Sequence, residues 1–202
     1  MQADIDHVLV HRDQIAQRVG ELADQIAGDF APLCGPGAPA SAELTLLPIL
    51  TGSIIFVSDL MRQLPMMLRI RLVSVTSYPG TATATRGATI QKALTNVPAD
   101  LSRAHVLVVD DILDSGHTLR EVSQFLRDRG AATVRTCVLL RKQRPQAMAC
   151  PVDYVAFDIP DEFVVGYGLD FDDYYRNLPD VCTLKPSVIE AAQARTQVIG
   201  SR

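Results

Sequence analysis

Apolar residues recur at helical spacing in three parts of the chain. Over residues 8–27, successive apolar positions are four, three and four residues apart, which places them on one face of a helix. These positions are Ile15, Val19, Leu22 and Ile26. A second apolar stripe, after Gly52, predicts another helix. A third follows Thr118, which stands at capping-box distance from Glu121, and this helix is expected to end before Gly130.

Strand-like segments alternate with these helices. Residues 105–111 form a nearly continuous apolar run, typical of a parallel strand that is buried on both faces of its sheet. Three more segments are strand-like: residues 43–50, 69–78 and 132–140. Pro48 favours an edge position or a bulge for the first of them. The alternation predicts an α/β fold with a mostly parallel central sheet flanked by helices.

Residues from Asp153 onward lack a helical period and are rich in aromatic side chains. They hold four of the five tyrosines and three of the six phenylalanines. We interpret this segment as a small lobe packed over the carboxyl edge of the sheet. A single domain over residues 1–202 is expected, with a core at about residues 38–150. The N-terminal segment and residues 151–190, roughly, would form the small lobe.

The composition is that of an ordinary globular protein, and it excludes two classes of partner. Of the 202 residues, 48% are apolar and 21% are charged, and the formal net charge is −4. The acidic balance argues against a nucleic-acid binder, because such domains usually carry a basic surplus. The longest apolar stretch, residues 44–57, is interrupted by Pro48 and Gly52 and is too short to span a bilayer. No nucleic-acid or membrane partner is therefore expected.

The cysteines indicate a reducing compartment. They lie far apart and show no C-x-x-C spacing, so neither a zinc site nor a disulfide framework is expected. They are Cys34, Cys137, Cys150 and Cys182. A cytoplasmic location fits this pattern best.

Three carboxylates stand at or just after the end of the strand predicted over residues 105–111, and a hydroxyl-rich turn comes next. They are Asp110, Asp111 and Asp114, then Ser115, Gly116, His117 and Thr118. At the start of a helix, the N–H groups and hydroxyls of residues 115–118 would form a cradle for a phosphate monoester. Asp110 and Asp111 can accept hydrogen bonds from sugar hydroxyls or hold a divalent cation. A plain helix cap needs only one aspartate, so the pattern favours a phosphorylated sugar as the ligand.

The segment VVDDILDSGHTL, residues 108–119, resembles the signature of the type I phosphoribosyltransferases, which bind 5-phosphoribosyl-1-diphosphate. Three further blocks resemble the same family in the same order. LTGSIIFVSDL (residues 50–60) is similar to its diphosphate-binding loop, and SYPGT (77–81) to the start of its flexible catalytic loop. LLRKQRP (139–145) and residues 157–182 are similar to the base-binding hood of the hypoxanthine-guanine phosphoribosyltransferases.

The resemblance implies a type I phosphoribosyltransferase fold and the conversion of hypoxanthine or guanine to IMP or GMP, with release of diphosphate. Asp110 and Asp111 would contact the ribose 2′- and 3′-hydroxyls, directly or through Mg²⁺, and Asp170 would bind a second Mg²⁺. Asp114 would be the catalytic group, placed near N7 of the purine. The 5′-phosphate would be held by Ser115, Gly116, His117 and Thr118, and the diphosphate by Thr51, Gly52 and Arg176.

The same resemblance implies a base site in the hood. Lys142 would donate to the 6-oxo group, Phe163 would stack on the ring, and backbone groups at Val164 would meet the base edge. Ser77 and Tyr78 would belong to the flexible loop that excludes water. The expected assembly is a homodimer or homotetramer.

Two departures from the family pattern concern the sugar-diphosphate site. The family usually has Leu-Lys-Gly where this chain has Leu50-Thr51-Gly52, which removes a cationic side chain from the diphosphate loop. Its signature usually begins Glu-Asp rather than Asp-Asp. Two other functions stay open at this point: a regulator that senses the sugar diphosphate, and a phosphoribosyltransferase for another base such as xanthine.

Overall fold

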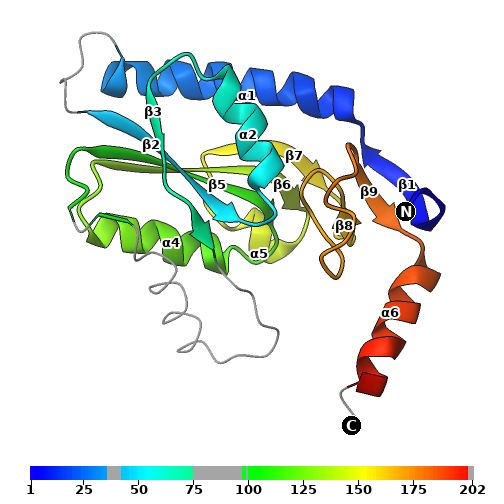
Figure 1. The fold of residues 1–202 in the computed structure, drawn as a ribbon. Helices are drawn as coiled ribbons and strands as arrows, with labels where there is room; N and C mark the ends of the chain where they lie inside the picture. Colours follow the sequence, from blue (N-terminus) through cyan, green and yellow to red (C-terminus); the bar gives the residue numbers. More distant parts are fainter. Residues whose placement is uncertain (36–41, 75–96, 99, 200–202) are drawn as a thin grey trace.

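A computed structural model describes residues 1–35, 42–74, 97–98 and 100–199. Its main sheet has the strand order β3-β2-β5-β6-β7, and every neighbouring pair is parallel (Figure 1). A short strand, β4, also pairs with β2. The bounds are β2 Glu43–Leu50, β3 Leu68–Ile70, β4 Val73–Ser74, β5 Ala104–Leu113, β6 Thr133–Lys142 and β7 Tyr154–Ile159. The predicted α/β fold with a parallel sheet is confirmed.

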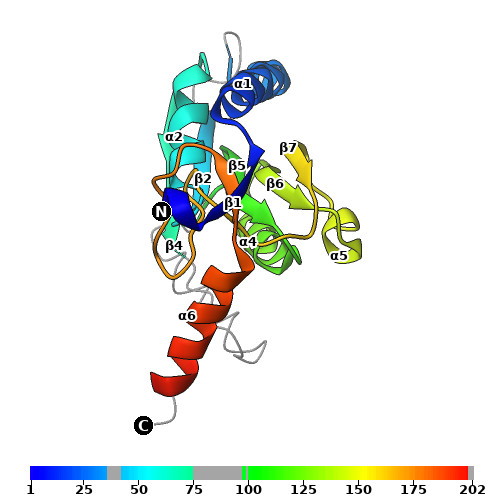
Figure 2. The same ribbon diagram turned by 90° about the vertical axis from the view of Figure 1, so that its right-hand side faces the viewer.

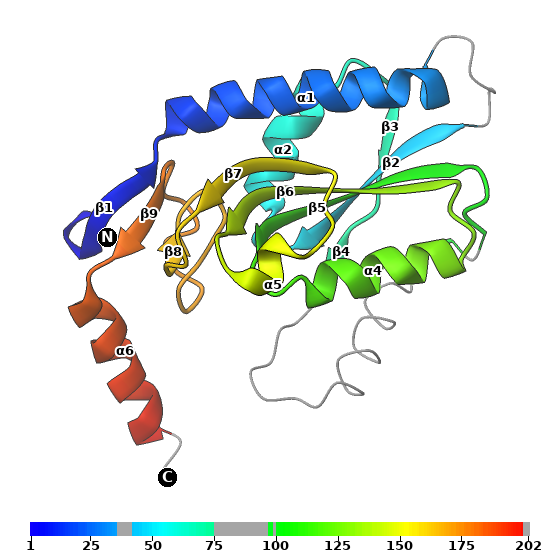
Figure 3. The same cartoon turned by 180° about the vertical axis from the view of Figure 1, so that it is seen from behind.

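Helices cover both faces of this sheet. Helices α1 and α2 lie on one face and α4 and α5 on the other, as Figure 1 and Figure 3 show from opposite sides. Their bounds are α1 Arg12–Cys34, α2 Ile54–Gln63, α4 His117–Asp128 and α5 Pro145–Met148. The predicted apolar stripe of α1 is buried against one face, and Leu119, Val122 and Leu126 of α4 are buried against the other. Each face of the sheet thus has its own core.

A small antiparallel sheet lies beyond the carboxyl ends of the main strands (Figure 1). Its order is β1-β9-β8, with β1 at Ile5–Val10, β8 at Val164–Val165 and β9 at Val181–Leu184. We call this sheet, together with residues 160–180, the hood. A short 3₁₀ helix, Gln2–Asp4, precedes β1, and α6, Pro186–Ile199, follows β9 and projects away from both sheets (Figure 2).

Three expectations about local structure were wrong. Residues 8–10 belong to β1 rather than to the first helix, because they pair with β9 far along the chain; the helix begins at Arg12, after a capping box at His11. Residues 154–159, placed in the small lobe from the sequence, form β7 and pair with β6 in the main sheet. The strand expected over residues 69–78 is divided into β3 and β4 up to residue 74, and its remainder lies outside the described residues.

Pro48 does not mark an edge strand. Strand β2 lies inside the sheet, between β5 on one side and β3 and β4 on the other. On the β3 and β4 side, pairing stops at Leu46 and resumes at Ile49. Pro48 falls in this interruption, which explains how a residue without a backbone N–H is accommodated there.

Within the described part of the chain, no helix is long and apolar enough to cross a membrane. All four cysteines are free.

Candidate active site

A cleft of about 640 Å³ opens at the carboxyl ends of β2 and β5, next to the start of α4 and the hood. It brings together eleven residues that the sequence singled out. They are Thr51, Gly52, Asp110, Asp111, Asp114, Ser115, Gly116, His117, Thr118, Asp170 and Arg176. Three separate segments of the chain therefore meet where parallel α/β sheets bind their ligands.

Two adjacent carboxylates, the buried Asp110 and the half-buried Asp111, form the floor of this cleft. Asp110 is 9% exposed, and burial, reinforced by the neighbouring charge of Asp111, raises its pKa well above the usual value. Burial also raises the pKa of Asp111. Two like charges in one buried place are unfavourable unless a ligand neutralises or hydrogen-bonds them. The floor is therefore built to receive a cation or a set of hydroxyl donors.

The turn before α4 has the form of an anion cradle. Gly116 is the N-cap, with φ +72°, and no side chain caps the helix. The predicted capping box at Thr118 was wrong, because the helix is capped two residues earlier, at Gly116, and begins at His117. A Cβ on Gly116 would lie 2.5 Å from Sγ of Cys150, so no larger residue fits. Without a side-chain cap, the first-turn N–H groups are available to a phosphate.

The turn after β2 packs directly on the carboxylate floor. The peptide bond between Leu50 and Thr51 is cis. A Cβ built on Gly52 would overlap Oδ2 of Asp111. The absence of a side chain at Gly52 therefore lets this backbone reach the edge of the cleft beside Asp111.

The hood supplies the opposite wall through an arginine. Arg176 forms ion pairs with Asp170 at 2.8 Å and Asp173 at 2.9 Å, and it donates to the carbonyl of Gly168 at 2.9 Å. A cation bound at Asp170 would have to share this carboxylate with Arg176. Among the described residues that line the cleft, Arg176 is the only arginine or lysine, so it is the cation available in place of the lysine that the family usually has at position 51.

The predicted base residues lie beside the cleft rather than in its lining. Lys142 ends β6, is 15% exposed, and places Nζ 4.0 Å from Oδ1 of Asp114. Phe163 is 46% exposed and stands edge-on to Phe171, with ring centroids 5.4 Å apart. Val164 is buried in β8. The two flexible-loop residues, Ser77 and Tyr78, lie outside the described residues.

Comparison with known proteins gives matches over almost the whole chain. The model of the phosphoribosyl transferase domain matches residues 9–172. The hypoxanthine-guanine phosphoribosyltransferase of Mycobacterium tuberculosis is 40% identical over 189 residues, which cover 93% of this chain and 90% of that protein. The enzyme of the same name from Streptococcus pneumoniae is 36% identical, over 93% of this chain and 98% of its own length.

The chain belongs to the hypoxanthine-guanine phosphoribosyltransferase family.

Solved structures of the family share this fold. The hypoxanthine phosphoribosyltransferase of Trypanosoma cruzi, in complex with the product IMP, has a TM-score of 0.77 and 31% identity, and the match covers 95% of this chain and 97% of that one. The Staphylococcus aureus enzyme has a TM-score of 0.79 and 34% identity, covering 93% and 96%. The type I phosphoribosyltransferase fold is thereby confirmed.

Two charged residues near this phosphoribosyltransferase cleft were missed from the sequence. Arg144 contacts Oδ1 of Asp114 through Nη1 and lies 3.2 Å from Oδ2 of Asp161 through Nη2. From the sequence, no role was assigned to Arg144 or Asp161. The available signal was its position, two residues after Lys142 at the end of a parallel strand.

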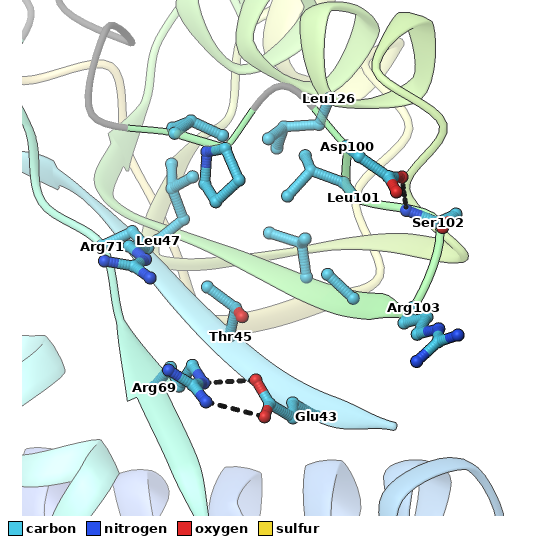
Figure 4. A pocket seen from close by; sticks show the side chains of 14 residues that line it. Glu43, Thr45, Leu47, Arg69, Arg71, Asp100, Leu101, Ser102, Arg103 and Leu126 are labelled. Carbon is cyan, nitrogen blue, oxygen red and sulfur yellow. Dashed lines mark hydrogen bonds and ion pairs between the residues drawn. The ribbon is translucent and has the colours of Figure 1, made fainter. Parts of the chain in front are cut away.

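A second hollow, of about 340 Å³, lies toward the amino ends of β2 and β5, away from this cleft. Figure 4 shows Leu47, Leu101 and Leu126 in it, with Arg71 and Arg103 near its margin. An ion pair between Arg69 and Glu43, at 2.8 Å for Nη2, borders it. None of the residues that the family signature identifies lines this hollow, so it is not the phosphoribosyl site.

The turn after β2 gives the first testable prediction. Thr51→Ala should change the Michaelis constant for the sugar diphosphate little, because backbone N–H groups and Arg176 are expected to hold the diphosphate. Gly52→Val should raise that constant by about 10²-fold or more, because the new side chain would overlap Asp111 and block the backbone approach. Steady-state kinetics of both variants test this. A large rise of this Michaelis constant in Thr51→Ala, together with an unchanged one in Gly52→Val, would contradict the prediction.

Proposed function

We propose that the protein is a purine salvage enzyme that transfers the 5-phosphoribosyl group from 5-phosphoribosyl-1-diphosphate to hypoxanthine or guanine. The products are IMP or GMP and diphosphate. The observation that carries this proposal is one cleft that joins the adjacent carboxylates Asp110 and Asp111, an uncapped helix start and Asp114. The IMP bound to the Trypanosoma cruzi relative supports the same product class.

The residues of the cleft suit the chemistry of this transfer. Displacing diphosphate from C1 of ribose builds positive charge on the sugar, which nearby carboxylates stabilise. Asp110 and Asp111 would hold the ribose hydroxyls, and the turn at residues 115–118 would hold the 5′-phosphate. Asp114 would accept the proton that the purine loses. No covalent nucleophile is needed.

The donor set fits magnesium that arrives with the substrate. Within the described residues, no group of three or more His, Cys, Asp or Glu side chains could hold a metal alone. Mg²⁺ commonly uses one or two carboxylates together with substrate phosphates and water. Asp110 and Asp111 supply such a pair, with Asp170 across the cleft. Bound there, Mg²⁺ would neutralise charge on the leaving diphosphate.

Magnesium dependence is the second testable prediction. Removing Mg²⁺ with EDTA should weaken calorimetric binding of the sugar diphosphate by about tenfold or more. Burial raises the pKa of Asp110 and Asp111, so protons compete with the cation at higher pH than for ordinary carboxyls. Binding with Mg²⁺ should therefore weaken as pH falls, and the weakening should begin at a higher pH than for ordinary aspartates, whose pKa is about 4.

Two variants sharpen this test. Asp111→Asn should remove most of the magnesium dependence, whereas Asp100→Asn, which changes a carboxylate in the second hollow, should leave it unchanged. Binding that is equally tight with EDTA would remove the metal from the proposal.

The function itself is tested by an ultraviolet assay with hypoxanthine, guanine and xanthine in turn. Nucleotide formation from hypoxanthine or guanine supports salvage, and preferential use of xanthine would reassign the base. Binding of the sugar diphosphate without nucleotide formation would instead support a metabolite sensor. Cytoplasmic location and assembly as a dimer or tetramer stay predictions.

A further inference from the structure

Four charged side chains join three loops at the carboxyl edge of the main sheet. Asp114 follows β5, Lys142 ends β6, Arg144 precedes α5, and Asp161 follows β7. Arg144 contacts Asp114 and Asp161 at once. Lys142 lies 3.3 Å from Oδ1 of Asp161 and 4.0 Å from Oδ1 of Asp114. Two cations and two carboxylates thus connect the loop after β5, which carries Asp114, to the beginning of the hood.

Both cations approach the same oxygen of Asp114. Arg144 and Lys142 lie against Oδ1, and among the described residues no hydrogen bond is donated to Oδ2. The Asp114 side chain is 48% exposed, so a ligand in the cleft can reach it. A carboxylate that is held through one oxygen presents the other in a fixed direction.

The backbone of Arg144 is itself held in place. Its N–H donates to the carbonyl of Lys142 at 2.8 Å, and the preceding N–H, of Gln143, donates to Ile159 at 2.8 Å. Pro145 follows, and a residue before proline is restricted to extended conformations, which agrees with φ −126° and ψ 150° at Arg144. The guanidinium therefore projects from a fixed point.

We propose that Arg144 is a positioning residue. It holds Asp114 through Oδ1, so that Oδ2 of Asp114 faces the proton on the purine base. The inference rests on the proposed function, because it requires a purine beside Asp114. Lys142 cannot fill this role alone, since it is to donate to the 6-oxo group of the base. A guanidinium, with its forked donors, can bridge Asp114 and Asp161 at the same time.

The test is steady-state kinetics with hypoxanthine for Arg144→Gln, Arg144→Lys, Asp114→Asn and the double variant Arg144→Gln/Asp114→Asn. Arg144→Gln should lower kcat about tenfold. Its Michaelis constant for the sugar diphosphate should change by less than about twofold. Arg144→Lys keeps a cation and should recover part of the loss. Once Asp114 is Asn, adding Arg144→Gln should cost less than about twofold, because both changes disrupt one unit.

Arg69→Gln is the matched control, because Arg69 is an exposed arginine in an ion pair far from the cleft. The kcat of Arg69→Gln and its Michaelis constant for the sugar diphosphate should equal those of the wild type. Any of three results would overturn the inference while leaving the salvage function standing. The first is a wild-type kcat in Arg144→Gln, and the second is a kcat in Arg144→Lys no higher than in Arg144→Gln. The third is a loss of kcat on adding Arg144→Gln that is as large in the Asp114→Asn background as in wild type. A wild-type protein that forms no nucleotide would remove the proposed function, and this inference with it.

Discussion

Asp114→Asn is expected to lower the turnover number for hypoxanthine by about 10²–10⁴-fold, the range for a lost general acid–base group. Asp114 lies in the cleft, and among the described residues its Oδ2 accepts no hydrogen bond, so that oxygen can take up the purine proton, which an amide cannot do. Affinity for the sugar diphosphate should change little, since Asp110, Asp111 and residues 115–118 are expected to grip that ligand.

Two measurements check this expectation: steady-state kcat, and calorimetric binding of the sugar diphosphate. Asp128→Asn is a suitable control, because Asp128 lies at the far end of α4 and accepts a hydrogen bond from Gln124. Near-normal turnover of Asp114→Asn would remove this residue from the mechanism. Loss of sugar-diphosphate binding in Asp114→Asn would mean that Asp114 holds the sugar diphosphate and not the purine.

Wild-type protein is expected to reject adenine relative to hypoxanthine by about 10⁴–10⁵-fold in kcat/KM. A lysine ammonium has three donors and no acceptor, so it can donate a hydrogen bond to an oxygen at purine C6 but repels an amino group there. Lys142 lies 4.0 Å from Asp114, the other group expected to contact the base, and it is largely buried. That placement suits a donor to the ring rather than a solvated surface charge.

Lys142→Gln should weaken the use of hypoxanthine and narrow the gap to adenine, because an amide can present either a donor or an acceptor. Lys185→Gln is the control, since Lys185 donates to the carbonyl of Ala3 in the 3₁₀ helix before β1, outside the base site. The measurement is kcat/KM for hypoxanthine, guanine and adenine on each protein. Equal use of adenine and hypoxanthine by the wild type would refute the base assignment.

The central part of the cleft could be predicted because it is local in sequence. Asp110 and Asp111 lie near the end of a buried strand, Asp114 directly follows that strand, and a helix begins three residues later. This order follows from the strand and helix periods, although the exact start of the helix does not. The parallel order of the sheet then brings Gly52, at the end of a neighbouring strand, to the same edge.

What the sequence could not predict depends on pairing between distant segments. Strand β1 exists because Val8 pairs with Cys182, and an apolar run of that length suits a helix equally well. The contacts of Arg144 with Asp114 and Asp161 arise because β5, β6 and β7 are neighbours with their carboxyl ends together. The sequence alone does not show which strands are neighbours, so it assigned Arg144 no contact.

The central claim is that this cleft joins a phosphoribosyl group to a 6-oxopurine. The most direct measurement mixes wild-type protein with hypoxanthine, 5-phosphoribosyl-1-diphosphate and Mg²⁺, and quantifies IMP and diphosphate by chromatography. We expect IMP and diphosphate in equal amounts, and neither product when EDTA replaces Mg²⁺. Binding of the sugar diphosphate without any IMP would contradict it.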